Sequence, residues 1–259
     1  MFRFFNGGAK IMDRVVNWIL QYAPIGVFAL IADVFGKQGA ESFGPLGFTT
    51  LAVYLGFVVH MVLVYSGMLL IFRLSPIAFF IKAREAIITA FVTRSSVETL
   101  PVSMDTSETK MGISQGVYSF SLPLGATINM DGTATYQGVC AIFVGFAIGM
   151  PLTISQQLTI IATSLLASIG TAGVPGAGAI MLMMVLNSVG LRVEPGSPVA
   201  FAYAMIFGID ALLDMRRTAC NVTGDLAVTC VVARSEDKMD ISAWQPYPET
   251  DTVMAAAGE

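Results

Sequence analysis

Six polar side chains recur along one face of an apolar segment in the last third of the chain. On a helix that advances about 100° per residue they fall within one arc of about 100°; they are Asp210, Asp214, Arg217, Thr218, Asn221 and Asp225. Inside a bilayer, each of these charges would cost roughly 2.5–3.5 kcal/mol on insertion scales. These groups therefore require one another, or ligands, as partners.

An acidic amino acid is a ligand that would satisfy them. It carries two carboxylates and one ammonium, so Arg217 could bind one carboxylate bidentately while Asp214 accepts hydrogen bonds from the ammonium. Asn221 and Thr218 could hold the second carboxylate. The residue types along this face are thus suited to binding a dicarboxylic amino acid.

Hard oxygen donors suited to a sodium ion lie in the same part of the sequence. Asp225, Asp131 and Asn129 provide side-chain oxygens, and locally unwound backbone would add carbonyl groups. A structural alternative stays open, because Asp214 and Arg217 are three residues apart and an internal ion pair would let the helix pack.

Composition indicates that this chemistry lies in a membrane. Of 259 residues, 55% are hydrophobic and only 12% are charged, and the mean hydropathy is +0.72, whereas soluble domains have about 25% charged residues. From Ser42 to Phe72 there is no Asp, Glu, Lys or Arg, and from Met111 to Leu191 there is only Asp131. We predict an all-α integral membrane protein with about five or six membrane-embedded segments.

Several other classes of function are disfavoured. A net charge of -4 without a basic cluster argues against a nucleic-acid partner. The three cysteines lack metal-ligand spacing and are interpreted as core residues; they are Cys140, Cys220 and Cys230. Arg217 beside Asp214 argues against a membrane aspartyl protease, whose two carboxylates share a proton. No enzymatic activity is predicted. His60 could be a proton relay, but a single histidine facing protein or a water pocket is the favoured interpretation.

The elements that position these groups fall into three regions. Residues 1–74 are predicted to contain two transmembrane helices, at 15–35 and 45–72, and residues 234–259 a polar, disordered tail. Residues 75–233 are predicted to form the substrate- and ion-binding core. Its parts are a hairpin at 76–110, a broken helix at 116–150, a second hairpin at 154–191 and a polar helix at 198–233.

The two predicted hairpins have unusual tips. A polar turn at 93–101 (TRSSVETLP) and a glycine-rich turn at 170–178 (GTAGVPGAG) each adjoin apolar arms that are short for a full span. Irregular backbone at membrane depth is tolerated only where it is buried in protein or lines an aqueous cavity. Two re-entrant hairpins, each followed by a helix with polar residues, predict a transporter core with a site near the midplane.

Four motifs carry a resemblance to a known family. They are TRSS with TLPV, SLPLGATINMDGT followed by YQG, SIGTAGVPGAGAIML, and D-x3-D-x2-RT-x2-NVTGD. In these motifs the chain strongly resembles the glutamate transporters, which are dicarboxylate/amino acid:cation symporters, over nearly all of 11–236. The resemblance implies sodium-coupled symport of aspartate or glutamate by an elevator-type core, with sodium as the coupling ion and no other cofactor. It also implies a multi-pass protein of the plasma or inner membrane, forming a homotrimer in a full-length context.

The resemblance also implies roles for individual residues. Substrate contacts would come from Ser95, Ser96, Thr133, Val174, Gly178, Asp214, Arg217, Thr218 and Asn221. A first sodium site would use Gly125, Asn129, Asn221 and Asp225, and a second the backbone carbonyls of Thr127, Ser168, Ile169 and Thr171. Asn129 and Asp131 would belong to a third site, which an earlier helix completes in the family.

The chain resembles only the C-terminal portion of family members, which have eight transmembrane helices and two hairpins. We therefore expect the four earlier helices, and much of the trimer scaffold, to be absent from it. A non-functional fragment, a dicarboxylate or proton-coupled symporter, and a passive anion channel remain alternatives. Arg217 argues against neutral substrates and Asp214 favours a substrate with an amino group, but aspartate and glutamate are not distinguished.

Overall fold

The computed structural model describes residues 43–244 without interruption, together with isolated positions between 7 and 36. The helix predicted at 15–35 therefore lies largely outside the described residues. Within 43–244 the regular structure is helical and contains no strand, apart from an isolated bridge between Ile113 and Met239. The all-α prediction is confirmed for this part of the chain.

The helices run along the chain from Phe43 to Trp244. The first segment comprises α2 (Phe43–Val59), the π-helix η2 (His60–Tyr65) and α3 (Ser66–Ile71). A helix pair follows, made of α4 (Pro76–Thr93), α5 (Ser96–Asp105) and the short π-helix η3 (Thr106–Lys110). The next helices are α6 (Gln115–Ile128), α7 (Asp131–Ala147), α8 (Ile154–Ile169) and α9 (Ala177–Ser188). The last elements are α10 (Pro198–Ser235) and the 3-10 helix η4 (Ile241–Trp244).

Local sequence explains where several of these helices begin. Ser75 and Ser197 each precede a proline at the first helical position, and each hydroxyl accepts a hydrogen bond from a backbone amide in the first turn. Thr153 and Gln156 form a capping box at the start of α8. Such caps satisfy amide groups that have no partner within the helix.

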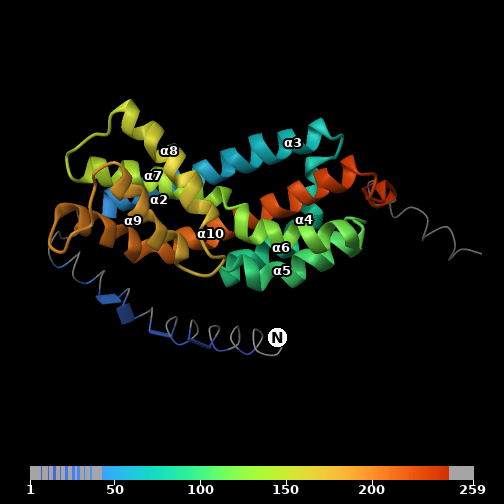
Figure 1. The fold of residues 1–259 in the computed structure, drawn as a ribbon, viewed down its shortest axis with the longest axis horizontal. Coiled ribbons are helices and arrows are strands. Elements are labelled where there is room, and N and C mark those ends of the chain that lie inside the picture. Colours follow the sequence, from blue (N-terminus) through green and yellow to red (C-terminus); the bar gives the residue numbers. More distant parts are fainter. Residues whose placement is uncertain are drawn as a thin grey trace, which may run out of the picture.

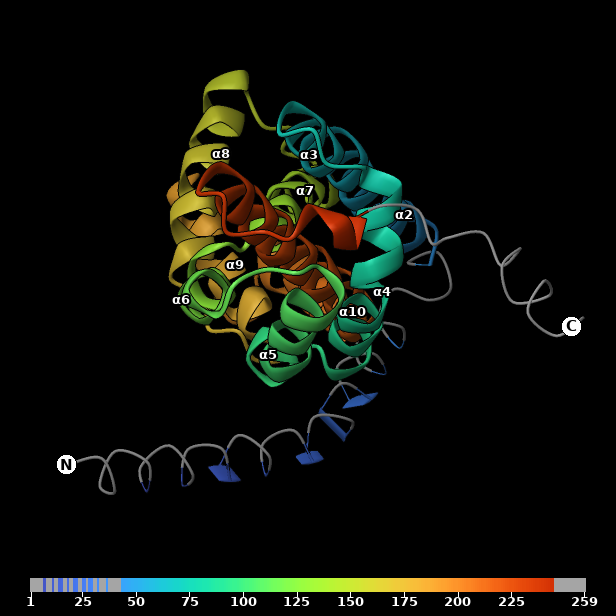
Figure 2. The ribbon, with the colours of Figure 1, turned by 90° about the vertical axis from the view of Figure 1, so that its right-hand side faces the viewer.

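The helix α10 occupies the centre of the molecule. It runs along the long axis in Figure 1, and the end-on view in Figure 2 shows the other helices arranged around it. In their most apolar stretches, 44% of α10 is buried but only 17% of the segment Gly44–Ile71. These two segments, of 38 and 28 residues, are long and apolar enough to cross a membrane. The segment of α2, η2 and α3 thus lies at the outside, whereas α10 is enclosed.

The residues directly after α10 differ from the predicted disordered tail at 234–259. The chain turns back and packs on the α5–α6 connection, where Trp244 Nε1 donates to the carbonyl of Met111 at 3.0 Å. The amide of Ser114 donates to the carbonyl of Lys238 at 2.9 Å. The large apolar ring of Trp244, which is buried, favours this packing despite the polar sequence around it. Residues 245–259 lie outside the described residues.

Candidate functional site

The polar face of α10 is buried along its whole length. All six of its members are at most 5% exposed. Arg217 lies between two carboxylates, with Nη1 at 3.3 Å from Asp210 Oδ1 and Nη2 at 2.6 Å from Asp214 Oδ1. Its guanidinium also lies over the ring of Tyr136, at 4.4 Å from the centroid. The internal ion pair considered from the sequence is therefore present, and both carboxylates use the same cation.

The second hairpin tip closes onto this ion pair. The amide of Gly176 donates to Asp214 Oδ2 at 3.0 Å, and Thr218 Oγ1 donates to Asp214 Oδ1 at 3.4 Å. A Cβ on Gly178 would lie only 2.7 Å from Arg217 Cζ, so glycine is needed for the tip to approach the guanidinium this closely.

The two hairpin tips also contact each other. Ser95 caps α5 and its hydroxyl donates to the carbonyl of Gly173 at 2.8 Å, while the amide of Val97 approaches the same carbonyl at 3.4 Å. Tips far apart in sequence thereby meet at α10. Backbone groups from both hairpins are available beside the side chains of α10.

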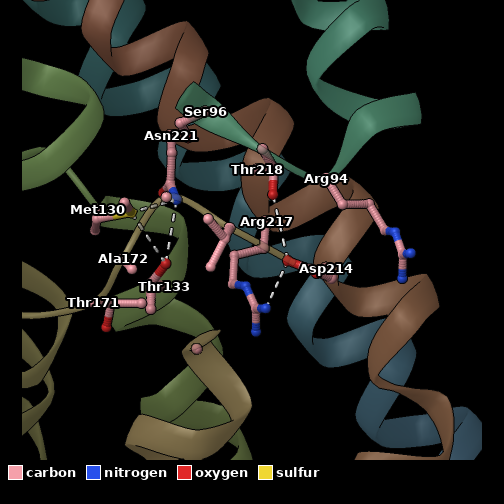
Figure 3. Close-up of a pocket in the computed structure, with 13 residues that line it drawn as sticks. Arg94, Ser96, Met130, Thr133, Thr171, Ala172, Asp214, Arg217, Thr218 and Asn221 are labelled. Carbon is pink, nitrogen blue, oxygen red and sulfur yellow. Dashed lines mark hydrogen bonds and ion pairs between the residues drawn. The ribbon is translucent and has the colours of Figure 1, made fainter. Parts of the chain in front are cut away.

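A small cavity lies where these elements meet. Its volume of about 10 Å³ is enough for roughly one water molecule. It is lined by Arg94, Ser96, Met130, Thr133, Thr171, Ala172, Gly173, Val174, Gly178, Asp214, Arg217, Thr218 and Asn221 (Figure 3). An amino acid does not fit this volume without movement of the tip or of Arg217, and we call this arrangement of the site closed.

The cavity contains most of the predicted substrate contacts and adds residues that the sequence analysis did not assign. Ser95 does not line it and instead binds the opposite tip. The additions are Arg94, Met130, Ala172 and Gly173. Arg94 ends α4 in a left-handed conformation with φ 56°. Its place in the TRSS motif, directly before Ser95, was the signal that could have identified it.

The break between α6 and α7 brings the first predicted sodium set together. Asn129 Nδ2 donates to Asp225 Oδ1 at 3.0 Å, and a Cβ on Gly125 would lie 2.6 Å from the same oxygen. Asn221 Oδ1 accepts from the amide of Gly132 at 2.8 Å. Side-chain oxygen atoms of Asp225 and Asn221, both on α10, thus lie next to the break between α6 and α7, and hard oxygen donors beside unwound backbone suit a sodium ion.

The second predicted sodium set comes from the ends of two helices, α6 and α8. Thr127 lies on the last turn of α6, and Ser168 and Ile169 end α8, with Thr171 just beyond. The hydroxyls of Thr127, Ser168 and Thr171 each donate to a carbonyl of their own helix or turn. Among the described residues, no hydrogen bond connects Thr127 to the other three.

Asp131, from the third predicted set, contacts the segment of α2, η2 and α3. Its Oδ2 atom lies 3.1 Å from His60 Nε2 and accepts from the hydroxyl of Tyr65 at 3.0 Å. His60 therefore faces a protein group, the carboxylate of Asp131. The three cysteines are buried and free, which confirms their interpretation as core residues.

Sequence comparisons relate the chain to a known family. The sequence profile of the sodium:dicarboxylate symporter family matches residues 1–235. The chain is 34% identical to the proton/sodium-glutamate symport protein of Bacillus caldotenax, over 95% of the chain and 56% of that protein. It is 37% identical to excitatory amino acid transporter 3 of Mus musculus, over 93% of the chain and 46% of that protein. The chain spans about half the length of the curated relatives it matches.

Proposed function

Since the chain belongs to the sodium:dicarboxylate symporter family, whose members are transporters and not enzymes, we propose that it forms the binding core of a sodium-coupled symporter for acidic amino acids. The observation that carries this proposal is the fully buried Arg217, enclosed by α10 and the second hairpin tip. A guanidinium in this position matches a carboxylate bidentately. The relatives named as glutamate symporters and excitatory amino acid transporters support the same substrate class.

Substrate binding would proceed by an exchange of ion-pair partners. In the closed structure Arg217 Nη2 binds Asp214 Oδ1 at 2.6 Å. The side-chain carboxylate of aspartate or glutamate would replace Asp214 on the guanidinium, and the released Asp214 would accept from the substrate ammonium. Thr218 and Asn221 would hold the other carboxylate. Arg217 and Asp214 would each keep a charged partner throughout, which avoids the large penalty for leaving a buried ion unpaired.

The charges of the site explain why a cation would accompany the substrate. When ionised, Asp210, Asp214 and Arg217 sum to one negative charge, and an acidic amino acid adds another. Asp225 contributes a further carboxylate with no cationic partner among the described residues. Sodium ions at Gly125, Asn129, Asn221 and Asp225, and at the carbonyls of Thr127, Ser168, Ile169 and Thr171, would offset this charge. We propose Asp131 as a ligand of a third ion.

The hairpins would act as re-entrant elements of an elevator-type core in a multi-pass cell-membrane protein, trimeric in a full-length context. Arm α9 has 12 residues and is about 18 Å long, shorter than a bilayer core of about 30 Å. The tips meet inside the protein, where irregular backbone is tolerated. The second tip would be the gate, because it covers the site and carries the close glycine contacts.

The function is tested by uptake into liposomes that contain the purified chain. An inward sodium gradient should drive accumulation of labelled aspartate or glutamate, with little uptake of succinate or alanine. Uptake that follows a proton gradient and ignores sodium would favour a proton-coupled symporter. Anion flux without any ion coupling would favour a channel, and no flux with any substrate would contradict transport by this chain.

The gate is tested by a spin label at Ala172, which lines the closed cavity. We expect an immobile label with sodium and aspartate together and a more mobile one with neither. The reason is that a site with room for about one water molecule must open to admit an amino acid. If the mobility of the label is the same with and without sodium and aspartate, gating by this tip is contradicted.

Gly178→Ala should weaken aspartate binding about tenfold while the protein remains folded. The added methyl would lie 2.7 Å from Arg217 Cζ and displace the guanidinium, and small misplacement of a binding group is costly. Isothermal titration would measure the effect. Gly170→Ala is the matched control, because its nearest neighbour would be 3.8 Å away. Equal effects of the two variants would mean that the tip backbone, and not Arg217, accounts for the loss.

A further inference from the structure

The outer segment of α2, η2 and α3 contains a π-helix that has no role in the function proposed so far. In an α-helix, residues five positions apart point about 140° away from each other. The wider π-turn pairs positions i and i+5, so His60 and Tyr65, at the two ends of η2, come to the same face. Their rings are in edge contact, with centroids 4.8 Å apart. Such single π-turns occur frequently at functional sites.

Both side chains bind the same carboxylate oxygen. His60 Nε2 lies 3.1 Å from Asp131 Oδ2, and Tyr65 donates its hydroxyl to that atom at 3.0 Å. An ionised carboxylate only accepts, so when Asp131 is charged the first contact requires the proton on His60 Nε2. No hydrogen-bond donor reaches Asp131 Oδ1 within the described range 43–244. One oxygen is therefore held in place and the other is left for a ligand.

Tyr65 also connects this carboxylate to the central helix. Its hydroxyl lies 3.2 Å from the carbonyl of Cys220. A Cβ on Gly224 would lie 2.5 Å from both Tyr65 Oη and Asn129 Nδ2. The outer segment, the break between α6 and α7, and α10 thus meet at a single buried hydroxyl. Tyr65 is 1% exposed, so water does not replace these contacts.

We propose that His60 and Tyr65 are positioning residues for a coupling cation at Asp131. They hold Oδ2 of Asp131 so that its Oδ1 faces the cation. The π-turn of η2 places both donors within reach of that one oxygen. This inference rests on the proposed function, in which Asp131 binds a coupling ion. It adds the outer segment of α2, η2 and α3 to the ion-binding machinery.

The test is the sodium dependence of thermal stability of the purified chain, with choline replacing sodium. Tyr65→Phe should raise the half-saturating sodium concentration about tenfold, because it removes one buried hydrogen bond to a charged group. Sodium at saturating concentration should still stabilise the variant. Tyr54→Phe is the matched control, since Tyr54 lies on α2 and donates to the carbonyl of Leu212 on α10 at 2.8 Å, away from Asp131. It should leave the sodium dependence unchanged.

Two further variants separate positioning from general packing. Tyr65→Phe should have no additional effect on sodium dependence in an Asp131→Asn background, because the tyrosine acts through that carboxylate. His60→Gln, which keeps an N–H donor, should preserve more sodium affinity than His60→Ala.

Two outcomes would overturn the inference and leave the proposed function intact. One is that the effects of Tyr65→Phe and Asp131→Asn on the half-saturating sodium concentration add. The other is that Tyr65→Phe and Tyr54→Phe shift this concentration equally. A wild-type chain without any sodium-dependent stabilisation would overturn it as well. Sodium stabilisation without aspartate transport would contradict only the proposed function.

Discussion

Arg217→Cys should eliminate measurable aspartate binding and leave a folded helical protein. The guanidinium is the only cation on the polar face of α10 and would bind the substrate carboxylate with two hydrogen bonds. Removal of one partner from a buried, hydrogen-bonded charge pair costs about 2–5 kcal/mol or more, which corresponds to a loss of affinity of roughly thirtyfold or greater. Titration of aspartate into the purified variant, in saturating sodium, measures this loss.

Two control variants distinguish the loss of bidentate hydrogen bonding by the guanidinium from the loss of its charge or of the folded structure. Arg217→Lys keeps the charge but not the bidentate geometry, so we expect weak residual binding. Arg216→Cys changes the neighbouring arginine, which lies over the ring of Tyr54 at 5.9 Å and does not line the cavity. It should bind aspartate normally. If Arg217→Cys has normal helicity by circular dichroism and an unchanged affinity for aspartate, Arg217 is not a substrate ligand.

Asp225→Asn should weaken sodium binding strongly and weaken aspartate binding by the same factor. The carboxylate is 5% exposed and accepts from Asn129 Nδ2 at 3.0 Å, with no cation near it in the described part of the chain. The amide keeps the shape but loses the charge that would balance sodium, and reciprocal coupling transfers the loss to the substrate. We expect a shift of about tenfold or more in the half-saturating sodium concentration.

The measurement is a series of aspartate titrations at increasing sodium concentration. High sodium should restore most of the aspartate affinity of Asp225→Asn, since the substrate contacts themselves are unchanged. Asp105→Asn, at an exposed carboxylate on α5, is the charge-matched control and should behave as wild type. Identical sodium dependence in Asp225→Asn and wild type would exclude Asp225 as a sodium ligand.

Much of the architecture could be predicted because it depends on local sequence. Apolar arms with serine or threonine caps define where α4, α8 and α10 begin, and the residues Asn129 and Met130 separate α6 from α7 as the clustered polar residues indicate. The periodicity of the polar face placed its six members on one side of α10. These signals each lie within one continuous segment, and a single sequence is enough to recognise them.

The remaining features depend on contacts between distant segments. The π-helix at His60–Tyr65 is supported by bonds to Asp131, 71 and 66 residues away in sequence. The closed cavity and the shared pairing of Arg217 with Asp210 and Asp214 depend on where the hairpin tip lies. Trp244 was assigned to a disordered tail because the polar composition around it outweighs one aromatic residue. The periodicity of residues within one segment does not show which distant segments come into contact.

The central claim is that sodium and an acidic amino acid bind together at the polar face of α10. Equilibrium binding of labelled aspartate to the purified chain, with sodium and then with choline at equal ionic strength, tests it most directly. The account predicts saturable binding in sodium, competed by glutamate and nearly abolished in choline and in Arg217→Cys. Binding of equal strength in choline, or equal binding by Arg217→Cys, would contradict it.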